Sequence, residues 1–139
     1  MNSPSVLPRE IKFRIWNNSK AVERMLNWVF IKQLRIDELF EQKHLIPMQF
    51  TGLLDKNGKD VFEGDIVNSW MDLTPENKFT CVVVFANQGF KLEYAGVSGI
   101  YEEIDGRNNF EVIGNVFENP ELLSPPQPII SNNTNGGDI

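Results

Sequence analysis

The residues that could carry chemistry in this chain are few and scattered. His44 is the only histidine and Cys81 the only cysteine, so several histidines or cysteines cannot share a metal ion. A serine triad would also depend on His44 as its base. His44 lies near the C-terminal end of a predicted helix, which favours positive charge, and Cys81 begins an apolar run, where a thiol serves as a small buried side chain. We interpret both as structural residues.

Acidic residues come close together at two places in the sequence, and paired carboxylates can support acid–base catalysis or metal-dependent hydrolysis. The two groups are Glu63 with Asp65, and Glu102 with Glu103 and Asp105. Both lie beside glycine turns, so we interpret them as solvated loop acids and keep a metal-dependent hydrolase as a third alternative. The serine in Gly96-Val97-Ser98-Gly99 lacks the strand and helix of a nucleophile elbow. We predict no catalytic, metal-binding or cofactor-binding residue.

The sequence Asp55-Lys56-Asn57-Gly58 has the alternating oxygen side chains and the glycine of a calcium-binding loop. The twelfth position of such a loop must supply a bidentate carboxylate, but here it is Ile66. Short polar side chains and glycine between two apolar runs are typical of a tight turn. Residues 53–59 are therefore predicted to be a hairpin tip.

The one basic and aromatic group is Lys12, Arg14 and Trp16, which alternate with apolar residues in a predicted strand over residues 9–16. Cations attract phosphate and an aromatic ring can stack on a base, so this group is a possible binding face for nucleic acid. Exposed charges on a strand also prevent unwanted edge pairing. The pattern leaves both interpretations open and favours the second.

Composition predicts one domain of a globular protein, because 139 residues with 41% hydrophobic content can bury a core without disulfides. The net charge of −6 argues against a protein that coats nucleic acid. The basic residues are concentrated in residues 1–50, and the rest of the chain is strongly acidic. The sequence has no apolar run of about 20 residues and no signal-peptide pattern, which predicts a cytoplasmic protein without a membrane segment.

The predicted elements of the first half begin with the strand at 9–16 and a turn at Asn17-Asn18-Ser19. Residues 25–31 are predicted to be its partner strand, although their lack of alternation leaves a helix open. A helix follows over residues 33–45, and Pro47 ends it before an extended segment at 48–50. After the hairpin tip, Gly64 is predicted to break the return strand and start another.

The second half is predicted to begin with a loop over residues 70–78. Strands at 81–85 and 90–94 form a hairpin in which Gly89 supplies positive φ. A loop that contains one short irregular element occupies 95–109, a strand with a bulge at Gly114 occupies 110–117, and Asn119 begins a short helix. Residues 124–139 are rich in Pro, Asn and Gly and are predicted to be a disordered tail.

Three phrases resemble, in the right order, the signatures of the YopX family of phage and prophage proteins. They are Arg9-Glu10-Ile11-Lys12-Phe13-Arg14; Phe50-Thr51-Gly52-Leu53 followed by Glu63-Gly64-Asp65-Ile66-Val67; and Glu111-Val112-Ile113-Gly114-Asn115-Val116-Phe117-Glu118-Asn119-Pro120. The resemblance covers residues 9–123 and departs from the family pattern at 17–45 and 68–80. The family has no established activity, so the resemblance implies a prophage-encoded protein without known catalysis.

These observations predict a mainly β fold: a small SH3-like barrel of residues 48–117, with an N-terminal β-hairpin and one short helix packed on it. Residues 9–123 are predicted to form a single domain after a flexible start at 1–8. We expect a non-catalytic protein-interaction module that forms homo-oligomers and acts on a host or phage protein. The alternative is a nucleic-acid-binding accessory protein that uses Lys12, Arg14 and Trp16.

Overall fold

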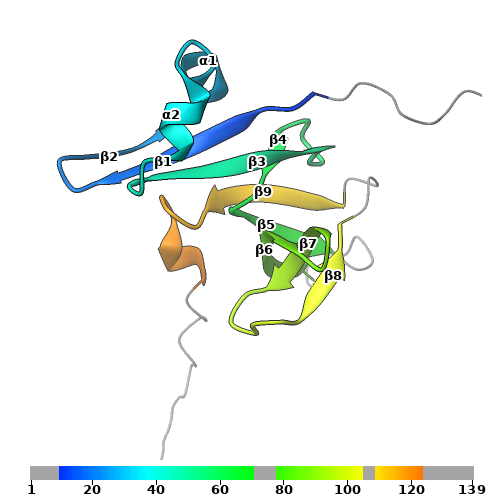
Figure 1. The fold of residues 1–139 in the computed structure, drawn as a ribbon. Helices are drawn as coiled ribbons and strands as arrows, with labels where there is room; N and C mark the ends of the chain where they lie inside the picture. The colour runs from blue at the N-terminus through cyan, green and yellow to red at the C-terminus, as the bar shows by residue number, and fades with distance from the viewer. Residues whose placement is uncertain (1–9, 71–77, 105–108, 124–139) are drawn as a thin grey trace, which may run out of the picture. The chain divides into compact units, whose positions relative to one another are not determined.

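The structure is a computed structural model that describes residues 10–70, 78–104 and 109–123. The predicted mainly β fold is confirmed, because the described residues form two small antiparallel sheets with only two short α-helices. Figure 1 shows the second of these sheets curling strongly, as in small barrels. The chain divides into two compact units, Met1–Glu63 and Gly64–Ile139.

The first unit contains a four-stranded sheet in the order β2-β1-β3-β4. Its strands are β1 (Phe13–Ser19), β2 (Val22–Leu26), β3 (Leu45–Leu54) and β4 (Asp60–Phe62). The predicted N-terminal hairpin is β1 with β2, but its turn lies at residues 20–21 and not at 17–19. Strand β1 continues to Ser19 because Asn17 and Asn18 pair with Arg24 and Glu23.

Two short helices, α1 (Trp28–Ile31) and α2 (Ile36–Phe40), connect β2 to β3 beside the sheet (Figure 1). The predicted strand at 25–31 therefore ends at Leu26 and gives way to the helix that its irregular pattern left open. The amide oxygen of Asn27 caps α1 by accepting the N–H of Phe30 at 3.1 Å. The predicted helix at 33–45 is reduced to the five residues of α2.

The reason for the shortened helix is the long strand that follows it. Leu45 and Pro47 belong to β3, and Pro47 lies opposite Ile15 in the sheet. The prediction that Pro47 ends the helix was wrong, because β3 has already begun at Leu45. Burial supports this arrangement: the first unit has a core cluster of Ile15, Leu26, Ile31 and Leu45, with Trp28, Ile36 and Leu39 packed against it.

The predicted hairpin tip at 53–59 is confirmed between β3 and β4. One carboxylate oxygen of Asp55 accepts the N–H of Asn57 at 2.8 Å and that of Lys59 at 2.9 Å. Asp55 is buried and Gly58 has φ of 79°, as a turn of this kind requires. The Asp55 carboxylate, which suggested a calcium-binding loop, therefore stabilises the backbone of the turn.

Gly64 begins the second unit, and its predicted role as a strand break is confirmed. Its φ is 88°, its N–H donates to the carbonyl of Val83 at 2.8 Å, and its own carbonyl accepts the N–H of Val116 at 2.9 Å. A side chain at this φ would be strained. The break falls inside the predicted barrel core of 48–117, so β3 and β4 join the N-terminal hairpin in one sheet and the later strands form the other.

The second unit contains a five-stranded sheet in the order β8-β7-β6-β5-β9. Its strands are β5 (Asp65–Trp70), β6 (Lys78–Ala86), β7 (Gly89–Tyr94), β8 (Tyr101–Glu103) and β9 (Phe110–Asn115). The hairpin of β6 and β7 is confirmed, but positive φ lies at Asn87 (51°) and Gln88 (69°) and not at Gly89. A two-residue turn of type I′ needs both of its central residues in this region, and asparagine tolerates it.

The predicted bulge at Gly114 is confirmed by a register shift in the pairing of β9 with β5. A Cβ at Gly114 would lie 2.6 Å from the amide oxygen of Asn119, which accepts the N–H of Asn115 at 3.1 Å. Asn119 precedes a single 3-10 turn, Pro120–Leu123. The predictions for residues 1–8, for most of the loop at 70–78 and for the tail at 124–139 fall outside the described residues.

Candidate functional site

Two of the predicted binding residues, Lys12 directly before β1 and Arg14 within it, face side chains of β3 and β4. The ammonium group of Lys12 lies 2.6 Å from a carboxylate oxygen of Asp60, 3.3 Å from one of Glu10 and 4.6 Å from the centre of the Phe50 ring. The hydrogen bond to Asp60 raises the pKa of Lys12, against the opposing effect of burial. The Lys12 charge is therefore already balanced within the first unit.

Arg14 and Trp16 are similarly engaged. The guanidinium of Arg14 lies 4.9 Å from the centre of the Phe62 ring and donates to the carbonyl of Glu63 at 3.3 Å. Trp16 is only 7% exposed, and its indole N–H donates to the amide oxygen of Asn18 at 3.3 Å. An aromatic ring must be accessible to stack on a base, and Trp16 in this arrangement is not. All three residues thus contact other residues of the first unit, and binding of nucleic acid through them stays a prediction.

The acidic residues have specific partners in the structure. Asp65 is 1% exposed, which corrects the expectation that it is a solvated loop acid, because β5 begins at this residue. A carboxylate oxygen of Glu63 accepts the N–H of Gln49 at 3.3 Å. In the second unit, Glu102 accepts the Tyr94 hydroxyl at 2.9 Å and Glu103 lies 3.3 Å from the ammonium of Lys91. Asp105 lies outside the described residues.

The thiol of Cys81 is completely buried, in agreement with the prediction of a structural role. Burial, with a smaller effect from the Glu102 charge, raises its pKa to about 12. Its partner across the sheet is Tyr94, whose pKa is raised chiefly by its hydrogen bond to Glu102. A neutral, inaccessible thiol is neither a nucleophile nor a metal ligand.

His44 lies four residues after the end of α2, exposed to solvent, and its carbonyl accepts the N–H of Asn18 at 2.7 Å. Within residues 10–70, 78–104 and 109–123, no group of three or more His, Cys, Asp or Glu side chains could hold a metal ion. No helix in those same residues is long and apolar enough to cross a membrane. The predicted absence of catalytic and cofactor-binding residues stays a prediction.

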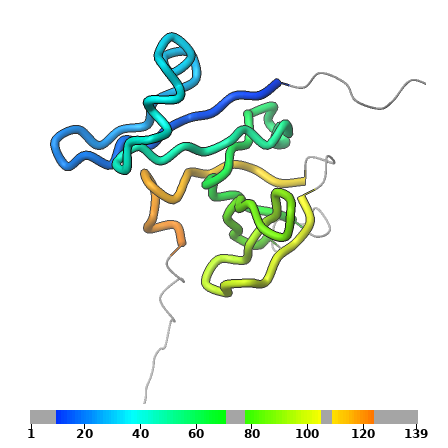
Figure 2. Tube along the Cα trace, in the orientation of Figure 1, coloured from blue at the N-terminus to red at the C-terminus, as the bar shows by residue number. Residues whose placement is uncertain are grey.

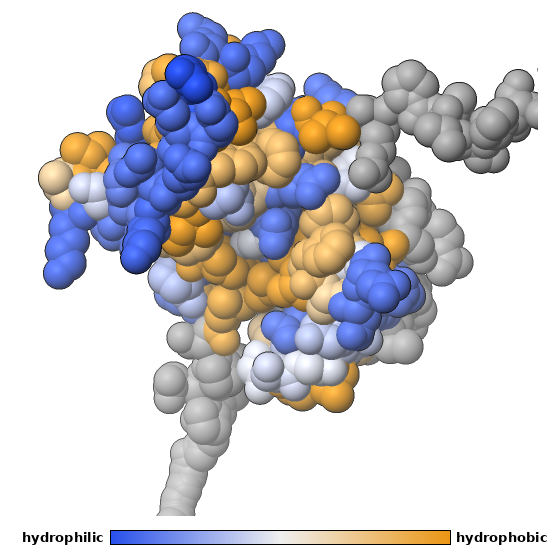
Figure 3. Space-filling model, viewed as in Figure 1, coloured by the Kyte–Doolittle hydropathy of each residue, from blue (hydrophilic) through white to orange (hydrophobic). Residues whose placement is uncertain are grey.

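The first unit exposes several apolar side chains in and directly after α1. Val29, Phe30 and Leu34 are 64%, 45% and 41% exposed, and we call these three residues the helical surface. Figure 3 shows hydrophobic residues among hydrophilic ones over the helical segment at the top of the view. The adjacent Ile31 is fully buried, so the segment is anchored in the core while its neighbours point outward.

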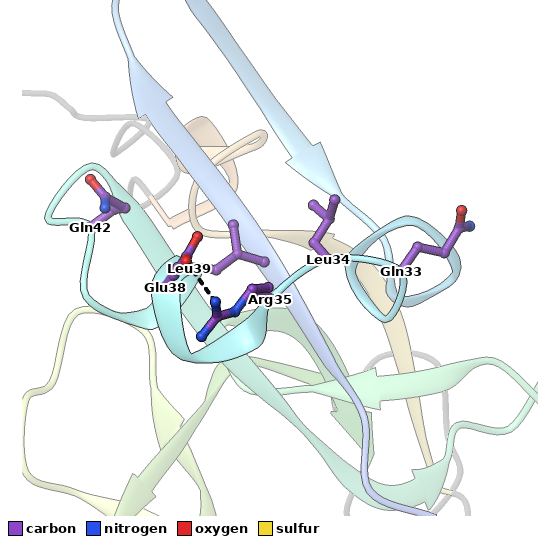
Figure 4. A pocket seen from close by; sticks show the side chains of 6 residues that line it. All are labelled: Gln33, Leu34, Arg35, Glu38, Leu39 and Gln42. Carbon is purple, nitrogen blue, oxygen red and sulfur yellow. Dashed lines mark ion pairs between the residues drawn. The ribbon is translucent and has the colours of Figure 1, made fainter.

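A shallow depression of about 450 Å³ lies next to the helical surface. It is lined by Gln33, Leu34, Arg35, Glu38, Leu39 and Gln42 (Figure 4). Arg35 forms ion pairs with Asp37 at 2.8 Å and with Glu38 at 3.3 Å. The depression thus combines two leucine side chains with charges of both signs.

The second unit also exposes apolar residues, in the loop between β7 and β8. Val97 and Ile100 are 49% and 51% exposed, beside a hollow of about 350 Å³ whose walls include Val82, Tyr94 and Leu123. Sequence reasoning overlooked both exposed surfaces. The available signals were the missing alternation at residues 25–31 and the apolar residues placed between the glycines of 96–100.

Two solved structures are similar to this chain. One is the crystal structure of protein EF1440 from Enterococcus faecalis, with 23% identity, a TM-score of 0.51 and coverage of 84% of this chain and 100% of that chain. The other is the X-ray structure of protein yopX from Bacillus subtilis, with 18% identity, a TM-score of 0.51 and coverage of 84% and 98%. At these identities the likeness shows the fold alone.

The comparison with curated proteins gives no match. A family model described as YopX protein matches residues 12–124, which are most of the chain and include the strands of both sheets. This family has no established activity, so the match assigns no reaction and no ligand. It confirms the resemblance carried by the three sequence phrases, and the chain belongs to the YopX family.

Proposed function

We propose that this protein is a non-catalytic protein-interaction module whose first unit binds a second copy of the chain through the helical surface. The observation that carries the proposal is the exposure of Val29, Phe30 and Leu34 within six residues. Exposed apolar side chains that gather in one place are typical of sites where proteins associate. Burying them against a second copy would remove them from water.

The helical surface is held in a fixed conformation before any partner binds. Ile31 is anchored in the core, Asn27 caps α1, and the side-chain amide of Gln33 donates to the carbonyl of Val29 at 2.8 Å. Less conformational entropy is lost on binding when the contacting residues are already ordered. This order supports a binding role for the segment.

A second copy suits this surface because of its charges. Residues 27–44 contain equal numbers of each sign: Lys32, Arg35, Lys43, Asp37, Glu38 and Glu41. In a two-fold symmetric dimer the same surface of both copies forms the contact, so a basic residue of one copy can lie opposite an acidic residue of the other. A surface that carries both signs can therefore pair with itself. The net charge of −6 would oppose self-association through an acidic surface, but this segment is neutral.

The test is sedimentation velocity at increasing protein concentration. We expect the wild-type protein to dimerise and the double variant Val29→Ser/Phe30→Ser to remain monomeric. The matched control is Ile11→Ser, which removes an apolar side chain that is 55% exposed elsewhere in the first unit. Circular dichroism verifies that each variant is folded. A wild-type protein that stays monomeric, or a double variant that dimerises normally, contradicts the proposal.

The proposed setting is the cytoplasm of a host cell that carries a prophage. The family resemblance supports it, and so does the presence of a single cysteine, which excludes an intrachain disulfide, because disulfides are rare in reducing compartments. Nucleic-acid binding through Lys12, Arg14 and Trp16 gains no support from their contacts. Salt-sensitive binding of a labelled single-stranded oligonucleotide, abolished by Trp16→Ala, would restore that alternative.

A further inference from the structure

The loop between β7 and β8 presents apolar side chains in the second unit, and Figure 2 shows it as the yellow-green turn at the bottom of the view. Val97, Ile100 and Tyr101 are 49%, 51% and 36% exposed, and we call them the loop surface. They lie in another unit from the helical surface and belong to different elements. The loop surface therefore requires its own explanation.

Hydrogen bonds fix the shape of this loop. The N–H of Tyr94 donates to the carbonyl of Ile100 at 3.1 Å, and the N–H of Val97 donates to the carbonyl of Tyr94 at 3.1 Å. A carboxylate oxygen of Glu93 accepts the N–H of Gly99 at 3.0 Å. Gly99 has φ of 84°, which favours glycine. The apolar side chains are thus displayed by an ordered turn.

The loop borders the hollow of about 350 Å³, whose walls include Val82, Tyr94, Val97 and Leu123. These walls are largely apolar, and Glu93 adds a carboxylate. A hollow of this kind accepts one large apolar side chain. In many protein complexes a few such anchor residues, each buried in a pocket of the partner, contribute most of the binding free energy. The geometry therefore suits a partner that inserts such a side chain.

The net charge of the second unit indicates which charge the partner carries beside the inserted apolar side chain. Residues 64–70, 78–104 and 109–123 contain seven acidic residues and only two basic ones, Lys78 and Lys91. Lys91 is already paired with Glu103. Of the seven acids, Glu93 lines the hollow and Asp65 is buried. The net negative charge of the unit attracts a basic segment and repels acidic peptides and nucleic acid.

We infer that the loop surface binds a basic segment of another protein, which places an apolar side chain in the hollow and Lys or Arg side chains over the neighbouring acids. This site is separate from the helical surface and does not require self-association. A second acidic unit would be repelled by this surface, so a second copy fits it less well than a basic partner.

The experiment is fluorescence anisotropy with the full chain and labelled peptides. The probe has one leucine pair flanked on both sides by lysines. Two matched peptides replace the lysines with glutamates or the leucines with serines. We expect the probe to bind, more weakly at higher salt, and both matched peptides to fail. No binding of the probe overturns the inference.

Variants of the chain locate the binding site. Val97→Ser/Ile100→Ser should weaken the probe roughly tenfold or more, as loss of an anchor contact does. Phe85→Ser, which changes a residue 58% exposed elsewhere in the second unit, should bind normally. Val29→Ser/Phe30→Ser should also bind the probe normally. Probe binding therefore tests the loop surface independently of the self-association that tests the helical surface. Normal probe binding by Val97→Ser/Ile100→Ser overturns the inference.

Two other occupants of the hollow are distinguished by the same measurements. Tighter probe binding after truncation at Leu123 would show that residues 124–139 compete for the hollow and would overturn the assignment to a separate protein. Self-association lost in Val97→Ser/Ile100→Ser and retained in Val29→Ser/Phe30→Ser would make a second copy the occupant and would also overturn it.

Discussion

The two units of this protein use charge in different ways. Met1–Glu63 contains ten basic and eight acidic residues, and Gly64–Ile139 contains three basic and eleven acidic ones. In the first unit, Lys12 and Arg14 lie against aromatic rings and backbone or carboxylate oxygens of neighbouring strands. In the second unit, the cross-strand pair of Lys91 and Glu103 leaves the glutamate side chain 79% exposed.

This difference separates the charges that stabilise the fold from those that remain available to a partner. A cation packed between an aromatic ring and a carboxylate has exchanged water for protein contacts, so it contributes to stability and offers little to a ligand. The net negative charge of the second unit, in which acids outnumber cations, attracts basic molecules at long range. Lys12, Arg14 and Trp16 therefore make contacts within the first unit, and we propose the loop surface of the second unit as the site that binds a basic partner.

The largest expected effect concerns Gly64, the first residue of the second unit. Gly64→Val should lower the free energy of unfolding by more than about 2 kcal/mol, because a β-branched residue is strained at φ of 88°. Gly89→Val is the control, since φ at Gly89 is not positive and an added Cβ meets only the flexible end of Lys91 at 3.4 Å. Urea denaturation measures both. A loss below about 0.5 kcal/mol for Gly64→Val would show that the unit boundary is not strained.

The second prediction concerns how the buried thiol of Cys81, in the second unit, makes stability depend on pH. Cys81 has a folded pKa of about 12, above its unfolded value, so the unfolded chain loses this proton first. The resulting stability is complete below pH of about 8.5 and is lost as pH rises toward the folded pKa. The Cys81 contribution should fall by about 2 kcal/mol between pH 7 and 10.

The measurement compares urea denaturation of the wild-type protein and Cys81→Ala at both pH values. Between pH 7 and 10 the wild-type protein should lose about 2 kcal/mol more stability than Cys81→Ala. Because all other groups titrate in both proteins, their contributions cancel in this difference. Equal losses in the two proteins would mean that Cys81 ionises as freely in the folded state as in the unfolded one. The raised pKa of Lys12 acts in the same direction at higher pH, since its contribution is lost as pH rises past about 10.4.

A matched pair of lysines tests the comparison of charges directly. Lys12→Met should cost about 1 kcal/mol, because it removes an ion pair at 2.6 Å and a cation–aromatic contact at 4.6 Å. Lys91→Met should cost less than about 0.5 kcal/mol, because Glu103 is 79% exposed and water replaces its partner. Thermal or urea denaturation gives both values. Equal costs would remove the distinction between the units.

The smallest expected effect is that of the C-terminal residues. Truncation after Leu123 should leave the melting temperature nearly unchanged, because residues 124–139 contain three prolines and few apolar residues that could offset the entropy lost on ordering. Differential scanning calorimetry of the full and truncated chains makes the comparison. A drop of several degrees would show that these residues pack against the protein.

Local sequence patterns determined the turns of this protein. The tip at 53–59 and the break at Gly64 depend on side chains and φ values within a few residues, so Asp55 and Gly64 could be interpreted without knowing the fold. The hairpin of β6 and β7 was equally predictable. The assignment of its positive φ to Gly89 failed because the two central residues of the turn, Asn87 and Gln88, take that conformation together.

Tertiary structure decided the elements whose patterns were ambiguous and the environment of each charge. Leu45 and Pro47 pair with β1 as part of β3, so the predicted helix is shorter than its sequence pattern suggested. Ile31 is buried in the core, so Val29 and Phe30 point outward. The alternation of residues 9–16 predicted that Lys12, Arg14 and Trp16 lie on one face. Only the pairing with β3 and β4 showed that this face is covered by Phe50, Asp60 and Phe62, because burial depends on residues far away in the chain.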